Sequence, residues 1–273
     1  MLIDGYNIKL QYTMDENWRP VNWIFFDLDD TLWNFSANSA ISLKKLYEIS
    51  PILRKLFPHI EEFIDIYHLH NATMWQLYSK GLVTTSELKL ERWRRTLATR
   101  QFEVLTAVCE ELERNYLEIL AQQQEMIPGV TELLDLLTKK FLLAILSNGF
   151  SKTQYKKLRY SGLNRYITRT IVSEEIGINK PNAKIFEYAI SETGATPPFL
   201  MVGDNAETDV VGAMRAGWFA AWFNPAGKDF PFSDEEMKGM GADPKYFLGT
   251  ARDMKDLEKI ISSFFSQENS TAE

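Results

Sequence analysis

Aspartates stand at the ends of two short apolar segments that lie far apart in the chain. Asp27 and Asp29 follow the first segment, in FFDLDDTLW, and Asp204 and Asp209 follow the second, in MVGDNAETD. A carboxylate can attack phosphorus and form an acyl phosphate, which divides one difficult displacement into two easier steps. Asp27 and Asp204 could hold Mg²⁺, which would offset the repulsion between a carboxylate and a phosphate dianion. These residues therefore predict magnesium-dependent phosphoryl transfer.

Other polar residues could complete this chemistry. Asp29 lies two residues from Asp27, close enough to act as general acid and base. Ser147 in AILSNGF could bind phosphate oxygens, Lys180 could add a positive charge, and the Thr31 hydroxyl could hold the turn or bond the phosphate. Taken singly, these residues are typical of turns, helix caps and surface lysines. Their combination after successive predicted strands favours the catalytic interpretation.

The order of the elements predicts how these residues come together. From Pro128 onward, helical and apolar segments alternate, which is typical of parallel strands with crossover helices, and so of a doubly wound, mostly parallel α/β sheet. In such sheets the ligand site lies at the carboxyl ends of the strands, where the polar residues above are found. We expect strands at 22–26, 141–146, 167–172, 199–202, 219–223 and 246–248.

The helical pattern of residues 36–125 predicts a second, all-helical domain. It interrupts an α/β core formed by residues 22–35 and 126–265. Residues 1–21 have weak periodicity and are predicted to be an N-terminal extension. The polar residues 266–273 are predicted to be a frayed tail.

Composition narrows the classes of partner. The net charge of −7 and the lack of a basic cluster disfavour nucleic acid, and no apolar run is long enough to span a membrane. The N-terminus does not resemble a signal peptide, and the single cysteine, Cys109, is expected to be a buried thiol in a reducing compartment. We therefore expect a cytoplasmic protein. His59, His68 and His70 lack a ligand cluster and are expected to be structural; the oligomeric state is not predicted.

Four motifs resemble those of the haloacid dehalogenase superfamily over about residues 22–226. They are DLDDT, SNG, KP and GDNAETD. The resemblance implies that Asp27 is the nucleophile and Asp29 the acid and base. It implies that Mg²⁺ is held by the Asp27 side chain, the Asp29 carbonyl and Asp204. It further implies that Ser147, Asn148 and Lys180 bind phosphate, that Asp209 lies near the metal or orients Lys180, and that the helical insertion is a cap over the substrate.

Three stretches resemble the pyrimidine 5′-nucleotidase-like, house-cleaning branch of that superfamily: WIFFDLDDTLWNF, ILSNGF and SEEIGINKPNAKIFEYAI. This resemblance implies a small phosphorylated metabolite as substrate, specifically a nucleoside monophosphate. Trp33 and Phe35 directly follow the nucleophile turn, so they are candidates for contacting the base. Trp75, Tyr78, Arg92 and Trp93 are further candidates in the insertion.

Other functions remain open at this point. The same residues would serve a phosphatase or phosphomutase acting on sugar phosphates or other small phosphorylated metabolites. A phospho-receiver module that does not turn over also gathers aspartates and a lysine at strand ends, but it needs neither a lid nor Asp29. A dehalogenase is disfavoured because it lacks the second aspartate.

Overall fold

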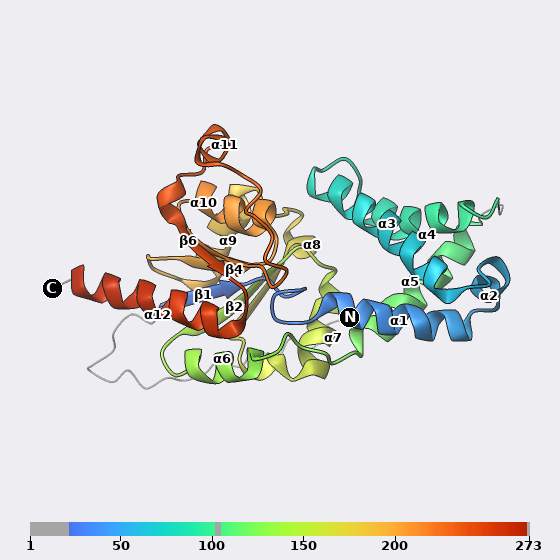
Figure 1. Ribbon diagram of the computed structural model, residues 1–273, viewed down its shortest axis with the longest axis horizontal. Coiled ribbons are helices and arrows are strands. Elements are labelled where there is room, and N and C mark those ends of the chain that lie inside the picture. Colours follow the sequence, from blue (N-terminus) through green and yellow to red (C-terminus); the bar gives the residue numbers. More distant parts are fainter. Residues whose placement is uncertain (1–21, 102–104, 272–273) are drawn as a thin grey trace, which may run out of the picture.

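The centre of the molecule is a parallel sheet of six strands, in the order β3-β2-β1-β4-β5-β6. The computed structural model describes residues 22–101 and 105–271 and is drawn in Figure 1. All five neighbouring pairs of strands run parallel, which confirms the predicted doubly wound α/β core. The strands are β1 (Trp23–Phe26), β2 (Leu142–Ser147), β3 (Arg169–Val172), β4 (Leu200–Gly203), β5 (Phe219–Phe223) and β6 (Phe247–Ala251).

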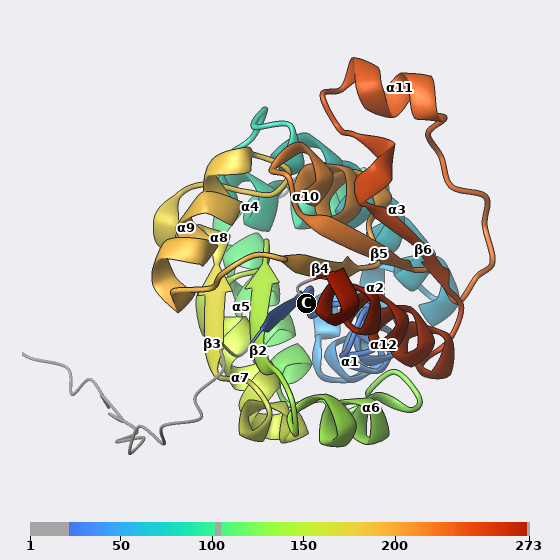
Figure 2. The ribbon, with the colours of Figure 1, turned by 90° about the vertical axis from the view of Figure 1, so that its left-hand side faces the viewer.

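Both faces of the sheet are covered by helices, so the strands β1, β4 and β5 at its centre are apolar along their whole length. In β1, Ile24 and Phe26 belong to one core, whereas Trp23 and Phe25 belong to the other. This division follows from the alternation of side chains along a strand. Figure 2 shows the two layers. The first core is covered by α6 (Val130–Leu137), α7 (Ser151–Ser161) and α12 (Met254–Thr271), and the second by α9 (Ala183–Thr193), α10 (Gly212–Arg215) and α11 (Asp234–Gly239).

The segment between β1 and β2 forms a separate helical lobe, which we call the cap. It lies to one side of the sheet in Figure 1, beyond the carboxyl ends of the strands. Tyr67, Trp93 and Tyr116 pack at its centre, with the ring centroids of Tyr67 and Trp93 4.5 Å apart. Its helices are α1 (Phe35–Ile49), α2 (Pro51–Leu56), α3 (Ile60–Ser79), α4 (Thr85–Ala98) and α5 (Thr106–Ala121).

The C-terminal helix is longer than the sequence predicted. The final helix α12 continues to Thr271, into the segment predicted to be frayed, because no proline or glycine interrupts Met254–Thr271. The predicted extension, residues 1–21, lies outside the described residues. Within the described ranges, no helix combines the length and the apolar character needed to cross a bilayer.

Candidate active site

Asp27 lies at the carboxyl end of the central strand β1. Its backbone N–H donates to the Val202 carbonyl at 2.8 Å, so the pairing with β4 continues through this residue and fixes where its side chain points. Asp27 is only 9% exposed. Burial raises the pKa of its carboxyl to about 7; the nearby Asp209 and Asp29 carboxylates act in the same direction, while Lys180 opposes them. The site therefore presents a carboxylate that needs positive charge to stay ionised.

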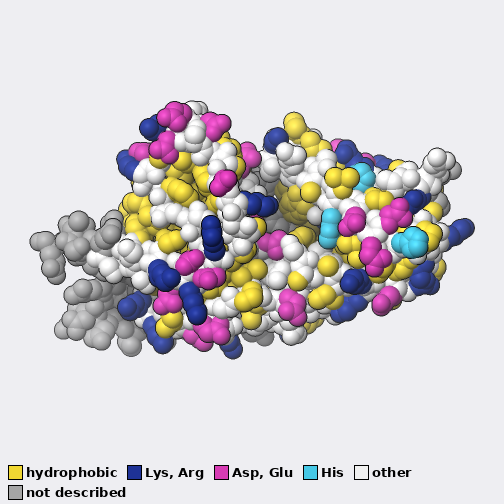
Figure 3. Space-filling view, viewed as in Figure 1, with side chains coloured by type: hydrophobic (Ala, Val, Ile, Leu, Met, Phe, Trp, Pro, Cys, Tyr) yellow, Lys and Arg dark blue, Asp and Glu magenta, His cyan; other side chains and the backbone are white. Residues whose placement is uncertain are grey.

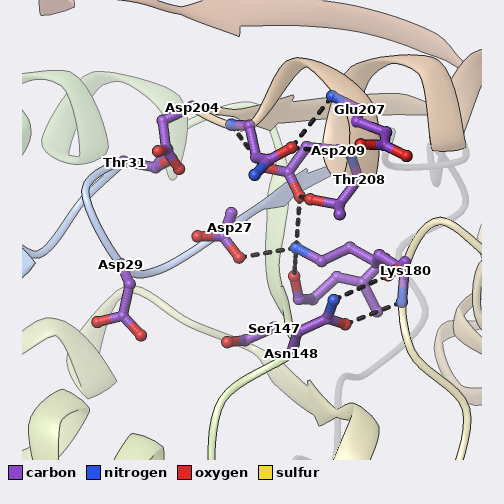
Figure 4. A network of polar contacts seen from close by, with 12 residues as sticks. Asp27, Asp29, Thr31, Ser147, Asn148, Lys180, Asp204, Glu207, Thr208 and Asp209 are labelled. Atoms are coloured by element: carbon purple, nitrogen blue, oxygen red, sulfur yellow. Dashed lines mark hydrogen bonds and ion pairs between the residues drawn. The ribbon is translucent and has the colours of Figure 1, made fainter. Parts of the chain in front are cut away.

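Lys180 supplies part of that charge from the loop before α9. Its Nζ lies 2.7 Å from Asp27 Oδ1 and 2.7 Å from Asp209 Oδ1, and it donates to the Leu146 carbonyl at 2.6 Å. Burial lowers the pKa of Lys180, but the Asp209 and Asp27 carboxylates outweigh it and raise the pKa overall. The ammonium group is therefore charged and held against the Asp27 carboxylate (Figure 4).

Asn148 fixes the loop that carries Lys180. Its Oδ1 accepts from the Lys180 backbone N–H at 2.8 Å, and its Nδ2 donates to the Lys180 carbonyl at 2.9 Å. Both polar atoms of the Asn148 side chain are thus engaged by the backbone. Its side chain positions Lys180. Asn148 also lines the cavity, and its contact with phosphate stays a prediction.

The end of β4 contributes Asp204 and Asp209. Asp204 Oδ1 accepts from the Thr31 hydroxyl at 3.2 Å. Asp209 approaches so closely that a Cβ at Gly203 would lie 2.2 Å from Asp209 Oδ2, so only glycine fits at position 203. Burial, together with Asp209 and Asp27, raises the pKa of Asp204 well above its usual range. Thr31 is fully buried and does not line the cavity, and its hydroxyl orients Asp204. This arrangement disfavours the predicted contact between the Thr31 hydroxyl and phosphate.

The carboxylates fit a divalent cation. Oxygens of Asp27, Asp204 and Asp209 lie within 4.8 Å of one another. In the part of the chain that the structure describes, Lys180 and Thr31 engage only one oxygen each of Asp27 and Asp204, so each keeps a second oxygen for a metal. Asp209 uses both oxygens, one on Lys180 and the other on the Asn205 N–H at 3.1 Å. Asp27 and Asp204 therefore offer hard oxygen donors of the kind that suits Mg²⁺, and Asp209 holds the Lys180 ammonium group.

Ser147 and Asp29 line the same cavity on the β2 side. Ser147 Oγ accepts from Gln154 Nε2 at 2.7 Å and from the Gly149 N–H at 3.1 Å. Since the oxygen is the acceptor in both, its own proton stays available to a phosphate oxygen. Asp29 points away from Asp27 and Lys180 in Figure 4, toward α7.

The cavity extends from these residues to the cap and has a volume of about 470 Å³. Figure 3 shows the hollow between the two lobes. Its cap wall is one face of α3, since Ala72, Trp75, Gln76 and Ser79 follow the i, i+3, i+4, i+7 spacing of a helical stripe. The Trp75 ring stacks on Phe150, with ring centroids 5.3 Å apart. The site thus has a charged floor, formed by Asp27, Lys180, Asp204 and Asp209, and an aromatic and polar wall formed by α3.

The family assignment agrees with this geometry. Residues 21–217 match the model of the haloacid dehalogenase-like hydrolases, which is most of the chain. The chain belongs to the haloacid dehalogenase-like hydrolase family. The superfamily resemblance inferred from the four motifs is confirmed, and with it the prediction that the protein is an enzyme that hydrolyses its substrate.

Relatives of this hydrolase include nucleotidases. The pyrimidine 5′-nucleotidase YjjG of Escherichia coli is 32% identical over 77% of this chain and 89% of its own length. The putative HAD-hydrolase YfnB of Bacillus subtilis is 32% identical over 74% of this chain and 83% of its own length. A magnesium-bound crystal structure of YfnB, reported to reveal interdomain movement, superimposes with a TM-score of 0.73 at 28% identity, covering 89% of this chain and all of that one. The resemblance to the nucleotidase-like branch is thereby confirmed.

The hydrolase fold brings together most of the predicted site residues at one cavity, but not Thr31 or Trp33. Asp27, Asp29, Ser147, Asn148, Lys180, Asp204 and Asp209 line one cavity, as does Phe35. Trp33 is fully buried and its indole N–H donates to the Gln123 carbonyl at 3.3 Å, so it does not reach the cavity. Trp33 is buried because backbone bridges pair it with Asp29 and with Met126, and this pairing places its ring in the hydrophobic core.

Several residues of the site were not found from the sequence. Asp30 lines the cavity with a left-handed backbone (φ 55°), and its carboxylate accepts from the Ser36 N–H and hydroxyl. Gln76 and Ser79 are on the α3 wall; their helical spacing with Trp75 marks one face, but the sequence does not say which face meets the core. Arg92 and Trp93, considered as ligand contacts, are buried inside the cap.

Proposed function

We propose that this hydrolase is a magnesium-dependent phosphatase that forms a phospho-aspartate on Asp27, with a nucleoside 5′-monophosphate, preferably a pyrimidine nucleotide, as substrate. The observation that carries the proposal is the pairing of Asp27 with Lys180 at 2.7 Å on the cavity floor. Among residues 22–101 and 105–271, one oxygen of Asp27 and one of Asp204 have no other hydrogen-bond partner. A nucleophile, a metal-binding pair and a fixed cation are what phosphoryl transfer to a carboxylate requires.

The chain's own residues would divide the reaction into two steps. In the first, an Asp27 oxygen bonds to phosphorus, the bond to the leaving oxygen breaks, and Asp29 gives that oxygen a proton. In the second, a water attacks phosphorus and passes a proton to Asp29, the bond to Asp27 breaks, and phosphate leaves. Lys180 and the Ser147 hydroxyl would stabilise the phosphoryl oxygens throughout. Mg²⁺, held by Asp27, the Asp29 carbonyl and Asp204, would neutralise charge and align the phosphoryl group.

The negative lining of the cavity supports the metal requirement. Among the described residues that line it, the acidic groups far outnumber the single cation, Lys180. A phosphate dianion would be repelled by this surface without a bound cation. The acidic lining residues are Asp27, Asp29, Asp30, Asp204, Glu207 and Asp209.

The cap side of the cavity supports a nucleotide. Trp75 and Phe35 offer aromatic rings beside the charged floor, and Gln76 offers an amide that can both donate and accept. A volume of about 470 Å³ falls in the usual range of small-ligand sites. The preference for pyrimidines rests on the relatedness to the E. coli nucleotidase YjjG.

The test is phosphate release from UMP, dTMP, AMP and small sugar phosphates, with Mg²⁺ and with excess chelator. We expect nucleotides to give the highest kcat/KM, no turnover in chelator, and no turnover by Asp27→Asn, because an amide neither attacks phosphorus nor binds Mg²⁺ well. Glu207→Gln, at the exposed rim of the same cavity, is the control and should stay active. A tenfold or greater preference for sugar phosphates would leave a phosphatase of a different substrate class; activity in Asp27→Asn would refute the mechanism.

A further inference from the structure

Helix α7 buries two polar side chains on the side that faces the active site. Gln154 is fully buried and Lys157 is 3% exposed, three residues apart and so on the same helical face. Burying an ammonium group and an amide is unfavourable unless each has partners. Neither residue belongs to the motifs that carry the family resemblance, so the resemblance assigns them no role. Their role has to be inferred from the groups that they contact.

Both side chains bind the same carboxylate. Lys157 Nζ lies 2.6 Å from Asp29 Oδ1, and Gln154 Nε2 donates to Asp29 Oδ2 at 2.8 Å. One donor on each oxygen fixes the plane of the carboxylate as well as its position. The Asp29 side chain nevertheless remains 28% exposed and lines the cavity. The Asp29 carboxylate is therefore held by two residues of α7, while the side that faces the cavity stays open to a ligand.

Gln154 also links Asp29 to the phosphate end of the site. The same Nε2 donates to Ser147 Oγ at 2.7 Å, so its two protons are used on Asp29 and Ser147. The approach depends on Gly149, since a Cβ there would lie 2.4 Å from Gln154 Nε2. Turning the amide over would place its oxygen against the Asp29 carboxylate, so the orientation is determined by the partners.

Lys157 has a second set of partners on the segment that leads into the cap. Its Nζ lies 4.4 Å from the centroid of the Trp33 ring and 5.4 Å from that of Phe35. A desolvated ammonium group over aromatic rings is stabilised electrostatically. The lysine is thus fixed between the Asp29 carboxylate and the start of the cap, and has little freedom to move away.

We propose that Lys157 and Gln154 are positioning residues that hold the Asp29 carboxylate in one orientation at the cavity wall for both proton transfers. They act through Asp29 and do not touch the substrate. Proton transfer depends steeply on the placement of the acid and base, so a carboxylate free to rotate would be a poorer catalyst in each step. This inference rests on the proposed function, in which Asp29 is the acid and base.

The test is a double-mutant cycle between Lys157→Met and Asp29→Asn, with kcat, KM and rapid-quench rates of phospho-enzyme formation and breakdown. We expect Lys157→Met to lower kcat for UMP by about 10- to 100-fold with KM changed less than about threefold, and to slow breakdown of the phospho-enzyme. In the Asp29→Asn background the same change should lower kcat by less than about threefold, because the group it positions is gone. Lys157→Arg should recover most of the activity.

The control is Lys156→Met, the neighbouring lysine, which pairs with Glu118 of the cap and not with Asp29. It should leave kcat unchanged. Gln154→Met, which keeps the packing but removes the donor, provides a second variant if Lys157→Met does not fold, and the same cycle with Asp29→Asn applies. Equal losses in both backgrounds, no loss, or a gain in kcat would overturn the proposal. Absence of Mg²⁺-dependent turnover in the wild type, or full activity of Asp29→Asn, would instead refute the proposed function and the positioning role with it.

Discussion

Asp27 combines burial with three neighbouring charges of both signs. Lys180 favours its ionised form, while burial and the Asp209 and Asp29 carboxylates oppose it, and the balance leaves its pKa at about 7. Burial and the Asp209 and Asp27 carboxylates likewise raise the pKa of Asp204. Two carboxyl groups that resist ionisation on their own are suited to a divalent cation, because the metal provides the missing positive charge.

The binding of Mg²⁺ should therefore depend on pH. Protons compete with the metal for Asp27 and Asp204, so affinity should fall as the pH drops through about 7, by up to about tenfold per pH unit for each proton displaced. In the metal-free protein, Asp27 binds a proton between pH 3.8 and about 7 that the unfolded chain has lost, so its contribution to stability decreases as pH rises through that window.

Thermal unfolding with and without Mg²⁺ at pH 6 and pH 8 measures this dependence. The increase in Tm caused by Mg²⁺ should be larger at pH 8. Asp204→Asn, which removes a proposed metal ligand, should lose the increase at both pH values. An increase that is equal or larger at pH 6 would contradict the argument.

Helix α3 forms the wall of the cavity opposite the catalytic core. Trp75 is partly exposed toward the cavity, and its other side stacks on Phe150. Stacking of a base on an aromatic side chain is worth about 1–3 kcal/mol. Trp75→Ala should therefore lower kcat/KM for UMP by about 10- to 100-fold, yet change it by less than about threefold for ribose 5-phosphate, which lacks the base.

The matched control for Trp75 is Leu69→Ala on the same helix. Leu69 is 65% exposed and does not line the cavity, so neither substrate should be affected. If Trp75→Ala lowers kcat/KM equally for UMP and ribose 5-phosphate, the ring serves the shape of the cap and does not recognise the base.

Helices α4 and α5 are joined by a buried ion pair inside the cap. Arg92 donates to Glu113 through both Nε and Nη2, Glu113 also accepts from the Trp93 indole N–H at 2.7 Å, and Arg92 Nη1 reaches Asn71. Removing one partner leaves a buried charge without compensation. Glu113→Gln should therefore lower the free energy of unfolding by about 3–5 kcal/mol.

Urea denaturation measures this loss. Glu118→Gln, in the exposed pair between Glu118 and Lys156, is the control and should cost less than about 1 kcal/mol. A similar small loss for Glu113→Gln would mean that the network contributes little to the stability of the cap.

Trp33 connects the cap and the catalytic core. It lies in the hydrophobic cluster that runs from β1 and α6 to the centre of the cap, and it pairs with Met126, where the chain returns from the cap. Trp33→Ala should lower the free energy of unfolding by about 3–5 kcal/mol because it leaves a large cavity.

Because Trp33 touches the junction and not the ligand, this variant should reduce kcat/KM for UMP and ribose 5-phosphate by a similar factor. Steady-state kinetics below the unfolding temperature, with circular dichroism to confirm folding, provide the comparison. Trp33→Phe should show smaller losses of both kinds. A loss confined to UMP would restore Trp33 as a residue that recognises the base.

The meeting of the catalytic candidates at one cavity could be predicted from the sequence because it depends on positions at strand ends. Asp27, Ser147, Lys180 and Asp204 follow consecutive strands of a parallel sheet, and the carboxyl ends of such strands meet at one edge whatever the details of packing. The same reasoning gave the order of strands and helices and the insertion of the cap, since local hydrophobic periodicity is visible in the chain itself.

Side-chain direction was decided only by the tertiary structure. Trp33 and Phe35 are two residues apart and equally aromatic, yet packing at the junction buries the first and leaves the second at the cavity. The Asn148 side chain faces the Lys180 backbone. The Lys157 side chain is buried and binds Asp29, which is more than a hundred residues away in sequence. Local patterns specify which elements form, but the direction of a polar side chain depends on partners that folding brings from distant parts of the chain.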